Sequence, residues 1–207
     1  MSDALVYYPA VETWYPKREG DNCVAYVEHA RVQDCEWATK RCKKARTVIQ
    51  AGGYIGLWPK KLSSLFDTVH TFEPVDDLRE ALRRNVKDCG NVFIGDEALG
   101  AAEGSAHFSF CPHGRSGLRV TPSSQLVKVT TIDSFNFSDV DLIYLDLEGG
   151  EPVALEGAKE TIARCSPTIV VEINPPMKNI TPKALEKLGY EFVCKAHTDH
   201  LFKRKGT

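Results

Sequence analysis

Residues 47–56 read Thr47-Val48-Ile49-Gln50-Ala51-Gly52-Gly53-Tyr54-Ile55-Gly56, and a second short run follows at Val69-His70-Thr71-Phe72-Glu73-Pro74. The first run opens with a compact apolar segment, as buried strands of parallel sheets do. Its glycines allow a sharp turn and a close approach of the backbone to a ligand, and the next helix can point its first N–H groups at that ligand. Glu73 ends the second run about 20 residues after Gly52, where nucleotide-binding units keep an acid for the ribose hydroxyls. The stretch therefore predicts a nucleotide-binding strand–turn–helix–strand unit, and the alternative is a βαβ unit with tight packing at the turn.

Composition narrows the class of protein. The chain has 207 residues, enough for one α/β domain with a sizeable core. Its 26 Lys and Arg residues against 28 Asp and Glu residues give a net charge of −2, which argues against a polybasic nucleic-acid or membrane-surface binder. We find no apolar run near the length of a membrane span and no signal-peptide pattern at the start. The seven cysteines form no CxxC pair, so we expect reduced thiols and a cytoplasmic protein.

Strand and helix patterns alternate from residue 47 to residue 188. This alternation predicts an α/β fold with a Rossmann-like, mostly parallel sheet and helices on both faces. Tyr190–Cys194 and His200–Lys203 are expected to close the sheet as an antiparallel C-terminal hairpin. Pro152 opens one of the predicted helices, with Leu155, Ala158 and Ile162 as its buried stripe. We expect a single domain overall, with residues 47–207 as its Rossmann-like part.

Residues 1–46 form a lead-in that is rich in aromatic side chains. One helix is expected from Asp21 and a second from Asp34 to about Arg46. Two placements are compatible with this segment: a cap over the ligand pocket, or packing across an edge of the sheet.

An insertion is expected between residues 101 and 131. Ala106–Phe110 and Leu126–Thr131 are typical of strands, and Cys111–Gly117 between them is typical of a loop. The loop is either a functional insertion or a plain solvent loop.

A second strand ends in acids. The strand expected over Asp141–Asp146 ends in Asp146-Leu147-Glu148-Gly149-Gly150-Glu151. Open α/β sheets bind their ligands beyond the carboxyl ends of their strands, so Asp146 and Glu148 become candidate site residues.

Taken together, these motifs resemble the FkbM family of S-adenosylmethionine-dependent methyltransferases over about residues 46–195. The pieces that carry the resemblance are Ala51–Gly56, Phe72–Pro74, Asn91–Gly100, Val127–Asp133, Asp146–Glu151 with Gly157–Ala158, and Pro167–Glu172. The resemblance implies a Rossmann-like fold, S-adenosylmethionine as cofactor, and methylation of a hydroxyl on a small molecule or glycan.

The resemblance also implies residue roles. The backbone of Gly52, Gly53 and Gly56 lies against the amino-acid part of the cofactor, and Glu73 holds the ribose hydroxyls. Asp96, Glu97 and Ala98 border the adenine. Asp146 and Glu148 face the sulfonium and the acceptor and are the candidate catalytic residues.

Two positions depart from the family pattern. Gln50, a candidate cofactor-binding residue, stands where the family usually has an acid, and Tyr54 stands where it usually has Asn. Because an amide lacks the charge that favours the cofactor's ammonium group, cofactor affinity is in question.

Several alternatives stay open. Asp146 acts either as a general base or only in positioning the cofactor. A Mg²⁺ site from Asp146, Glu172 and Asn174 is conceivable because oxygen ligands suit that ion, but the spacing differs from catechol-type methyltransferases, and we predict no metal. The competing functions are a non-catalytic nucleotide-binding module and a nicotinamide-dependent oxidoreductase. Against the oxidoreductase, the glycine turn of this sequence lacks the full GxGxxG spacing.

Overall fold

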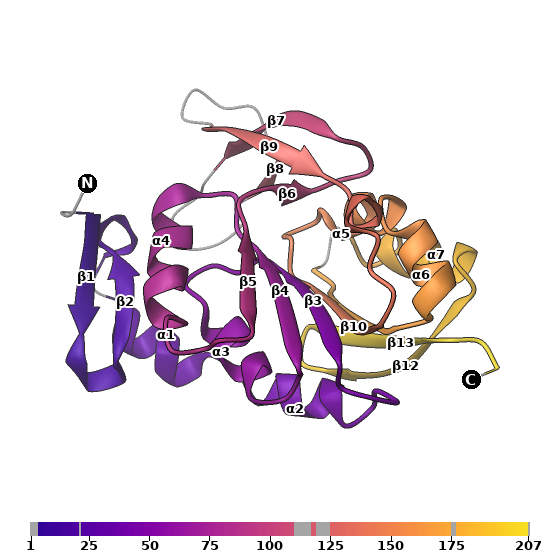
Figure 1. The fold of residues 1–207 in the computed structure, drawn as a ribbon, viewed down its shortest axis with the longest axis horizontal. Helices are drawn as coiled ribbons and strands as arrows, with labels where there is room; N and C mark the ends of the chain where they lie inside the picture. Colours follow the sequence, from indigo (N-terminus) through magenta and orange to yellow (C-terminus); the bar gives the residue numbers. More distant parts are fainter. Residues whose placement is uncertain (1–3, 21, 110–116, 119–124, 175–176, 207) are drawn as a thin grey trace.

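The computed structural model describes residues 4–20, 22–109, 117–118, 125–174 and 177–206. A seven-stranded sheet runs through the middle in the order β12-β13-β11-β10-β3-β4-β5 (Figure 1). Five strands are parallel: β3 (Thr47–Ala51), β4 (Thr68–Phe72), β5 (Val92–Gly95), β10 (Val140–Leu145) and β11 (Thr168–Glu172). The strands β12 (Tyr190–Ala196) and β13 (Asp199–Arg204) close one edge as the predicted antiparallel hairpin.

Helices cover both faces of the sheet, as the alternation predicted. Ile49, Ile143 and Ile169 point to the face covered by α5 (Glu151–Glu156), α6 (Lys159–Cys165) and α7 (Thr181–Lys187). Val48, Leu142 and Val170 point to the opposite face, covered by α2 (Asp34–Thr39) and α3 (Leu57–Ser63). Successive residues of a strand alternate between faces, so these almost wholly apolar strands build two cores. The predicted fold class is confirmed.

The chain reverses its direction of winding between β3 and β10. β3 is followed by β4 on one side, whereas β10 is followed by β11 on the other. Such a switch point leaves a crevice at the carboxyl ends of the strands.

The insertion forms a separate four-stranded sheet of order β6-β9-β7-β8, at the top of Figure 1. Its strands are β6 (Ala98–Leu99), β7 (Gly104–Ser109), β8 (Gly117–Leu118) and β9 (Gln125–Thr130). The two strands predicted in this region are thereby confirmed to within two residues. The predicted loop lies outside the described residues, except for Gly117.

The N-terminal segment packs against α4 (Asp76–Asn85). It forms a hairpin in which the 3₁₀ turn Pro9–Val11 connects β1 (Leu5–Tyr8) to β2 (Thr13–Pro16). A second 3₁₀ turn, Lys17–Glu19, and α1 (Cys23–His29) follow. The Asn85 side chain accepts from Trp14 N at 2.7 Å and donates to the carbonyl oxygens of Trp14 (2.9 Å) and Ile55 (2.8 Å). The hairpin was not predicted.

The prediction of a helix from Asp34 to about Arg46 is wrong, because α2 ends at Thr39. Arg46 has another partner: its backbone N–H and its guanidinium donate to the Asp141 carboxylate at 2.9 and 2.8 Å. These hydrogen bonds fix Arg46 directly before β3, which begins at Thr47. The expected helix after Pro152 is likewise divided, at Gly157, into α5 and α6.

In the ranges that the structure describes, no helix has the length and apolar character needed to cross a membrane. The six cysteines within those ranges are free thiols, as expected.

Candidate cofactor site and active site

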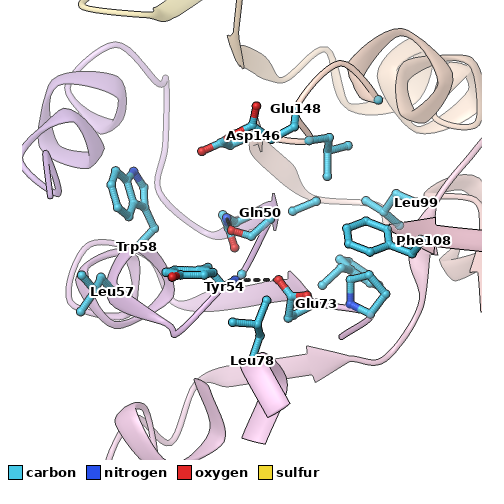
Figure 2. Close-up of a pocket in the computed structure, with 18 of the residues that line it drawn as sticks. Gln50, Tyr54, Leu57, Trp58, Glu73, Leu78, Leu99, Phe108, Asp146 and Glu148 are labelled. Carbon is cyan, nitrogen blue, oxygen red and sulfur yellow. Dashed lines mark hydrogen bonds between the residues drawn. The ribbon is translucent and has the colours of Figure 1, made fainter. Parts of the chain in front are cut away.

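A cavity of about 530 Å³ lies at the carboxyl ends of β3, β4 and β10. In Figure 2, Asp146 and Glu148 lie above Gln50, Glu73 and Leu78 lie below it, Trp58 is to the left, and Leu99 and Phe108 are to the right. Phe108 comes from the insertion, so the small sheet forms one wall. A cavity of this size suits a drug-sized ligand such as a nucleoside.

The glycine turn shapes the floor of the cavity. Gly52 has a φ of +85°, and a Cβ there would lie 2.0 Å from the carbonyl oxygen of Asp146. The Gly52 and Gly53 N–H groups both donate to Phe72 O, at 3.2 and 3.0 Å. Glycine is therefore needed at position 52 so that the β3 and β10 loops can meet beside the switch point.

Glu73 is placed as the sequence predicted, at the end of β4 and in the cavity wall. Its carboxylate accepts from Tyr54 N at 2.8 Å (dashed in Figure 2) and from Val75 N at 3.0 Å. Burial raises the pKa of Glu73 to about 7, although the two backbone hydrogen bonds oppose the rise. The carboxylate is therefore fixed in place, and it titrates near neutral pH.

The two residues that depart from the family pattern are both held by internal contacts. The Gln50 amide donates to Gly52 O at 2.9 Å and accepts from the Thr71 hydroxyl at 2.5 Å. Tyr54 adopts φ +46°, a left-handed conformation that Asn tolerates better. Its hydroxyl donates to the Tyr15 hydroxyl at 3.2 Å, which ties the turn to the N-terminal segment.

An acidic cluster stands across the cavity from Glu73. Asp146, Glu148 and Glu172 bring carboxylate oxygens within 4.8 Å of one another. The Asn174 amide donates to Glu172 at 2.7 Å and to Glu148 at 3.2 Å. Burial, the charge of Glu172 and a hydrogen bond with it raise the pKa of Asp146. A cation bound nearby would lower this pKa again, which favours Asp146 as a proton acceptor.

The loop that carries this cluster is held by the third acid of the motif. Glu151 is almost fully buried, and its carboxylate accepts from Leu147 N at 2.8 Å and Gly149 N at 3.3 Å. These bonds stabilise a turn in which Glu148 has a φ of +52°. Glu151 therefore positions the loop.

The cavity gathers most of the predicted site residues. Its lining includes Gln50, Gly52, Gly53, Glu73, Glu97, Ala98, Asp146 and Glu148. Gly56 and Asp96 are not part of the lining: Gly56 packs against α4, and Asp96 is exposed.

Sequence reasoning missed several lining residues, among them Tyr15, Glu19, Tyr26, Trp58, Leu78 and Phe108. Only the run of aromatic residues before residue 40 signalled any of them.

The doubly wound sheet, the glycine turn and the acid at the end of β4 define a Rossmann-like nucleotide-cofactor protein. A family model, Methyltransferase FkbM domain, matches residues 50–193. The chain belongs to the FkbM methyltransferase family. This membership supports S-adenosylmethionine as its cofactor, as the sequence predicted.

Solved structures share the fold at low identity. A methyltransferase FkbM from Methylobacillus flagellatus KT is 16% identical in sequence, with a TM-score of 0.60. The alignment covers 87% of the present chain and 52% of the Methylobacillus chain. A ribosomal protein L11 methylase from Lactobacillus delbrueckii subsp. bulgaricus is 14% identical (TM-score 0.55; 86% and 79% covered). Magnesium protoporphyrin IX methyltransferase from Synechocystis PCC 6803, with bound S-adenosylmethionine, is 11% identical (TM-score 0.54; 84% and 78% covered).

The chain spans about half the length of the Methylobacillus structure. A search of curated proteins finds no match.

Proposed function

We propose that this protein transfers a methyl group from S-adenosylmethionine to a hydroxyl oxygen of a small molecule or glycan. The acidic cluster of Asp146, Glu148 and Glu172 at the nucleotide-binding edge supports this most directly, because a hydroxyl acceptor must lose a proton as it attacks. We further propose that the protein is cytoplasmic and that its N-terminal residues up to 46 act as a cap, since Tyr15, Glu19 and Tyr26 line the cavity.

The cavity residues fit the cofactor. Glu73 accepts hydrogen bonds from the ribose hydroxyls, and Glu97 and Ala98 border the adenine together with Leu99 and Phe108. The backbone of Gly52 and Gly53 and the side chain of Gln50 lie against the amino-acid part. When bound, S-adenosylmethionine supplies a methyl group on positively charged sulfur, which a nucleophile displaces in line.

The protein then has three tasks. The cavity walls hold the acceptor oxygen in line with the methyl group, and alignment of this kind supplies much of the rate. Asp146 would accept the proton that the acceptor hydroxyl loses. Glu148 orients the acceptor from the same loop.

The test is a methyl-transfer assay with Asp146→Asn beside the wild type. The chain is incubated with methyl-labelled S-adenosylmethionine and a panel of sugars and alcohols, and products are identified by mass spectrometry. A general base at Asp146 predicts a fall in kcat of about 10²–10⁴-fold while S-adenosylhomocysteine binds within about threefold of wild type. Equal losses in kcat and cofactor affinity would instead assign Asp146 to cofactor positioning.

One observation favours a second candidate, a non-catalytic binding module. Gln50 is 1% exposed and holds the turn with an uncharged amide where the family usually has an acid. Cofactor binding without methyl transfer to any acceptor would support it. The family match and the three neighbours are methyltransferases, so the oxidoreductase alternative has no comparable support.

A further inference from the structure

A second, smaller cavity lies at the edge of the sheet opposite the cofactor cavity. Its volume is about 180 Å³, and it is formed where β3, β10 and β11 begin and β13 ends. This is the end of the molecule at which α2 lies, away from the insertion in Figure 1. The charged residues that line it are Lys43, Lys44, Arg46, Asp141, Lys203 and Arg204. We call this cavity the basic pocket.

Positive charge is in excess in the basic pocket. Arg46 neutralises Asp141: its backbone N–H and Nε donate to one carboxylate oxygen at 2.9 and 3.0 Å, and its Nη2 donates to the other at 2.8 Å. In the part of the chain that the structure describes, no carboxylate forms an ion pair with Lys43, Lys44 or Lys203. The three lysines therefore add positive charge that the lining does not balance, although the whole chain has a net charge of −2.

Two further acids lie near the basic pocket without lining it. The charge of Asp139 acts on Arg46, and Glu191 stands opposite Lys203 in the register of β12 and β13. Within the described ranges, neither acid forms an ion pair with Arg46 or with a lysine of the pocket. Even when both acids are counted and Arg204 is left out, positive charge remains in excess, so the pocket attracts anions.

Hydrogen bonds hold the walls of the basic pocket. The Arg204 guanidinium donates to the Ser166 hydroxyl at 2.9 Å and to Ala163 O at 3.4 Å, which ties the end of β13 to the end of α6. The Ser166 hydroxyl accepts in this contact, so its own proton can be donated to a ligand. Arg46 uses its Nε and Nη2 on Asp141, and its Nη1 makes no hydrogen bond to a described residue. Donors are therefore available beside the unbalanced lysines.

Size and charge indicate the class of ligand. The volume is below the roughly 300–1,000 Å³ of sites for drug-sized molecules, so it suits a single small group. Ammonium and guanidinium groups both make charge-assisted hydrogen bonds to phosphate oxygens. A phosphate monoester carries a charge of about −1.5 to −2 at neutral pH, whereas a diester carries only one negative charge. An excess of several cations favours the monoester.

We propose that the basic pocket binds the phosphate monoester group of a small molecule. The ammonium groups of Lys43, Lys44 and Lys203 neutralise the phosphate, and the Arg46 guanidinium and the Ser166 hydroxyl donate to its oxygens. The inference is independent of the proposed function, because the described linings of the two cavities have no residue in common. The strands β3 and β10, five and six residues long, separate the two sites by about 17–20 Å.

The first test measures anion binding by the wild-type chain. Inorganic phosphate, methyl phosphate and dimethyl phosphate are titrated at constant ionic strength with chloride as the balancing anion, and binding is followed by phosphorus NMR. Inorganic phosphate and methyl phosphate should each bind saturably with a dissociation constant of about 1 mM or lower. Dimethyl phosphate, which has one negative charge, should bind at least about fivefold more weakly.

Substitutions then locate the site. Lys44→Gln and Lys203→Gln should each weaken the binding of methyl phosphate about fivefold, and the double variant more than about twentyfold, because each removes one unbalanced charge. Lys203→Arg keeps the charge and should bind within about twofold of the wild type. Lys187→Gln removes an exposed charge on α7, outside the pocket, and is the matched control. The melting temperature reports whether each variant is folded, and if one single variant fails to fold, the other carries the test.

Several results would overturn the inference: no saturable binding of phosphate or methyl phosphate, equal affinity for dimethyl phosphate, full affinity in the double variant, or an equal loss in Lys187→Gln. A short single-stranded oligonucleotide is the last probe. If it binds more tightly per phosphate than methyl phosphate and loses this affinity in the double variant, the pocket binds a nucleic-acid backbone and the small-molecule inference is wrong. None of these measurements depends on methyl transfer.

Discussion

Glu73 should couple cofactor binding to pH. Its folded pKa of about 7 lies well above the ordinary value of 4.5. If the ionised carboxylate accepts the ribose hydroxyls, its ionised fraction rises about tenfold between pH 6 and pH 8 for a pKa near 7. The affinity for S-adenosylhomocysteine, which lacks the sulfonium charge, should rise by the same factor and then level off.

The stability of the unliganded protein should change in the opposite direction. Because the folded pKa is raised, Glu73 stabilises the fold fully below its unfolded pKa, and this contribution is lost as pH rises through the folded value. A shift of this size corresponds to about 3 kcal/mol lost between pH 4.5 and pH 7. Asp146, Glu151 and Asp199 also have raised pKa values and add slopes of the same sign. Only a comparison with a Glu73 variant isolates its share.

The assay is calorimetric titration with S-adenosylhomocysteine and denaturant unfolding, each from pH 5 to 8.5, on wild type, Glu73→Gln and Glu191→Gln. Glu191 is exposed on β12 and serves as the charge-matched control. At pH 8, Glu73→Gln should bind about 10–100-fold more weakly, because charge-assisted hydrogen bonds contribute about 1.5–3 kcal/mol. Wild-type affinity that stays flat from pH 6 to 8, or unfolding curves of wild type and Glu73→Gln that run parallel with pH, would refute the reasoning.

Two further substitutions test the frame around the site. Gly52→Ala puts a Cβ 2.0 Å from Asp146 O at a left-handed φ, so the free energy of unfolding should fall by more than about 2 kcal/mol and cofactor binding should weaken. Thermal unfolding and calorimetry measure the two effects, and wild-type stability of the variant would contradict the close approach. Asn85→Ala removes all three hydrogen bonds to Trp14 and Ile55, so the free energy of unfolding should fall by about 1–3 kcal/mol. In limited proteolysis the N-terminal segment should be cleaved faster than in the wild type, and an unchanged cleavage rate would show that this side chain does not hold the segment.

The parts of the fold that the sequence predicted well are those with short-range causes. β3 is a mostly apolar run, buried along its whole length and followed by glycine, and the predicted and observed limits agree at Thr47 and Ala51. Glu73 and Asp146 were found because each directly follows a buried strand. Parallel strands all end at the same edge of the sheet, so residues that directly follow them are neighbours in space.

The predictions that failed concern elements that depend on contacts distant in the sequence. Gly157, where the helix divides, lies against another element, since a Cβ there would lie 2.0 Å from the carbonyl oxygen of Gly100. The hairpin β1–β2 contains Pro9 and Pro16, a residue type that usually interrupts strands. Pro9 instead begins a 3₁₀ turn, and Pro16 ends a strand of a two-stranded sheet. Neither placement can be derived from local pattern.

The same limit explains why the sequence did not predict the part of the cavity lining that the N-terminal segment supplies. Glu19 and Tyr26 become site residues only because the N-terminal segment is held on α4 and on Tyr54. The Tyr54 N–H donates to Glu73 and its hydroxyl donates to Tyr15, so one residue contacts both the proposed ribose acceptor and the aromatic side chains of the N-terminal segment. Asn in its place would relax the left-handed backbone by about 1 kcal/mol but would lose this connection. The departure at position 54 is therefore best explained by the N-terminal segment: its aromatic side chains require a ring at the turn, and the backbone strain is the cost of placing it there.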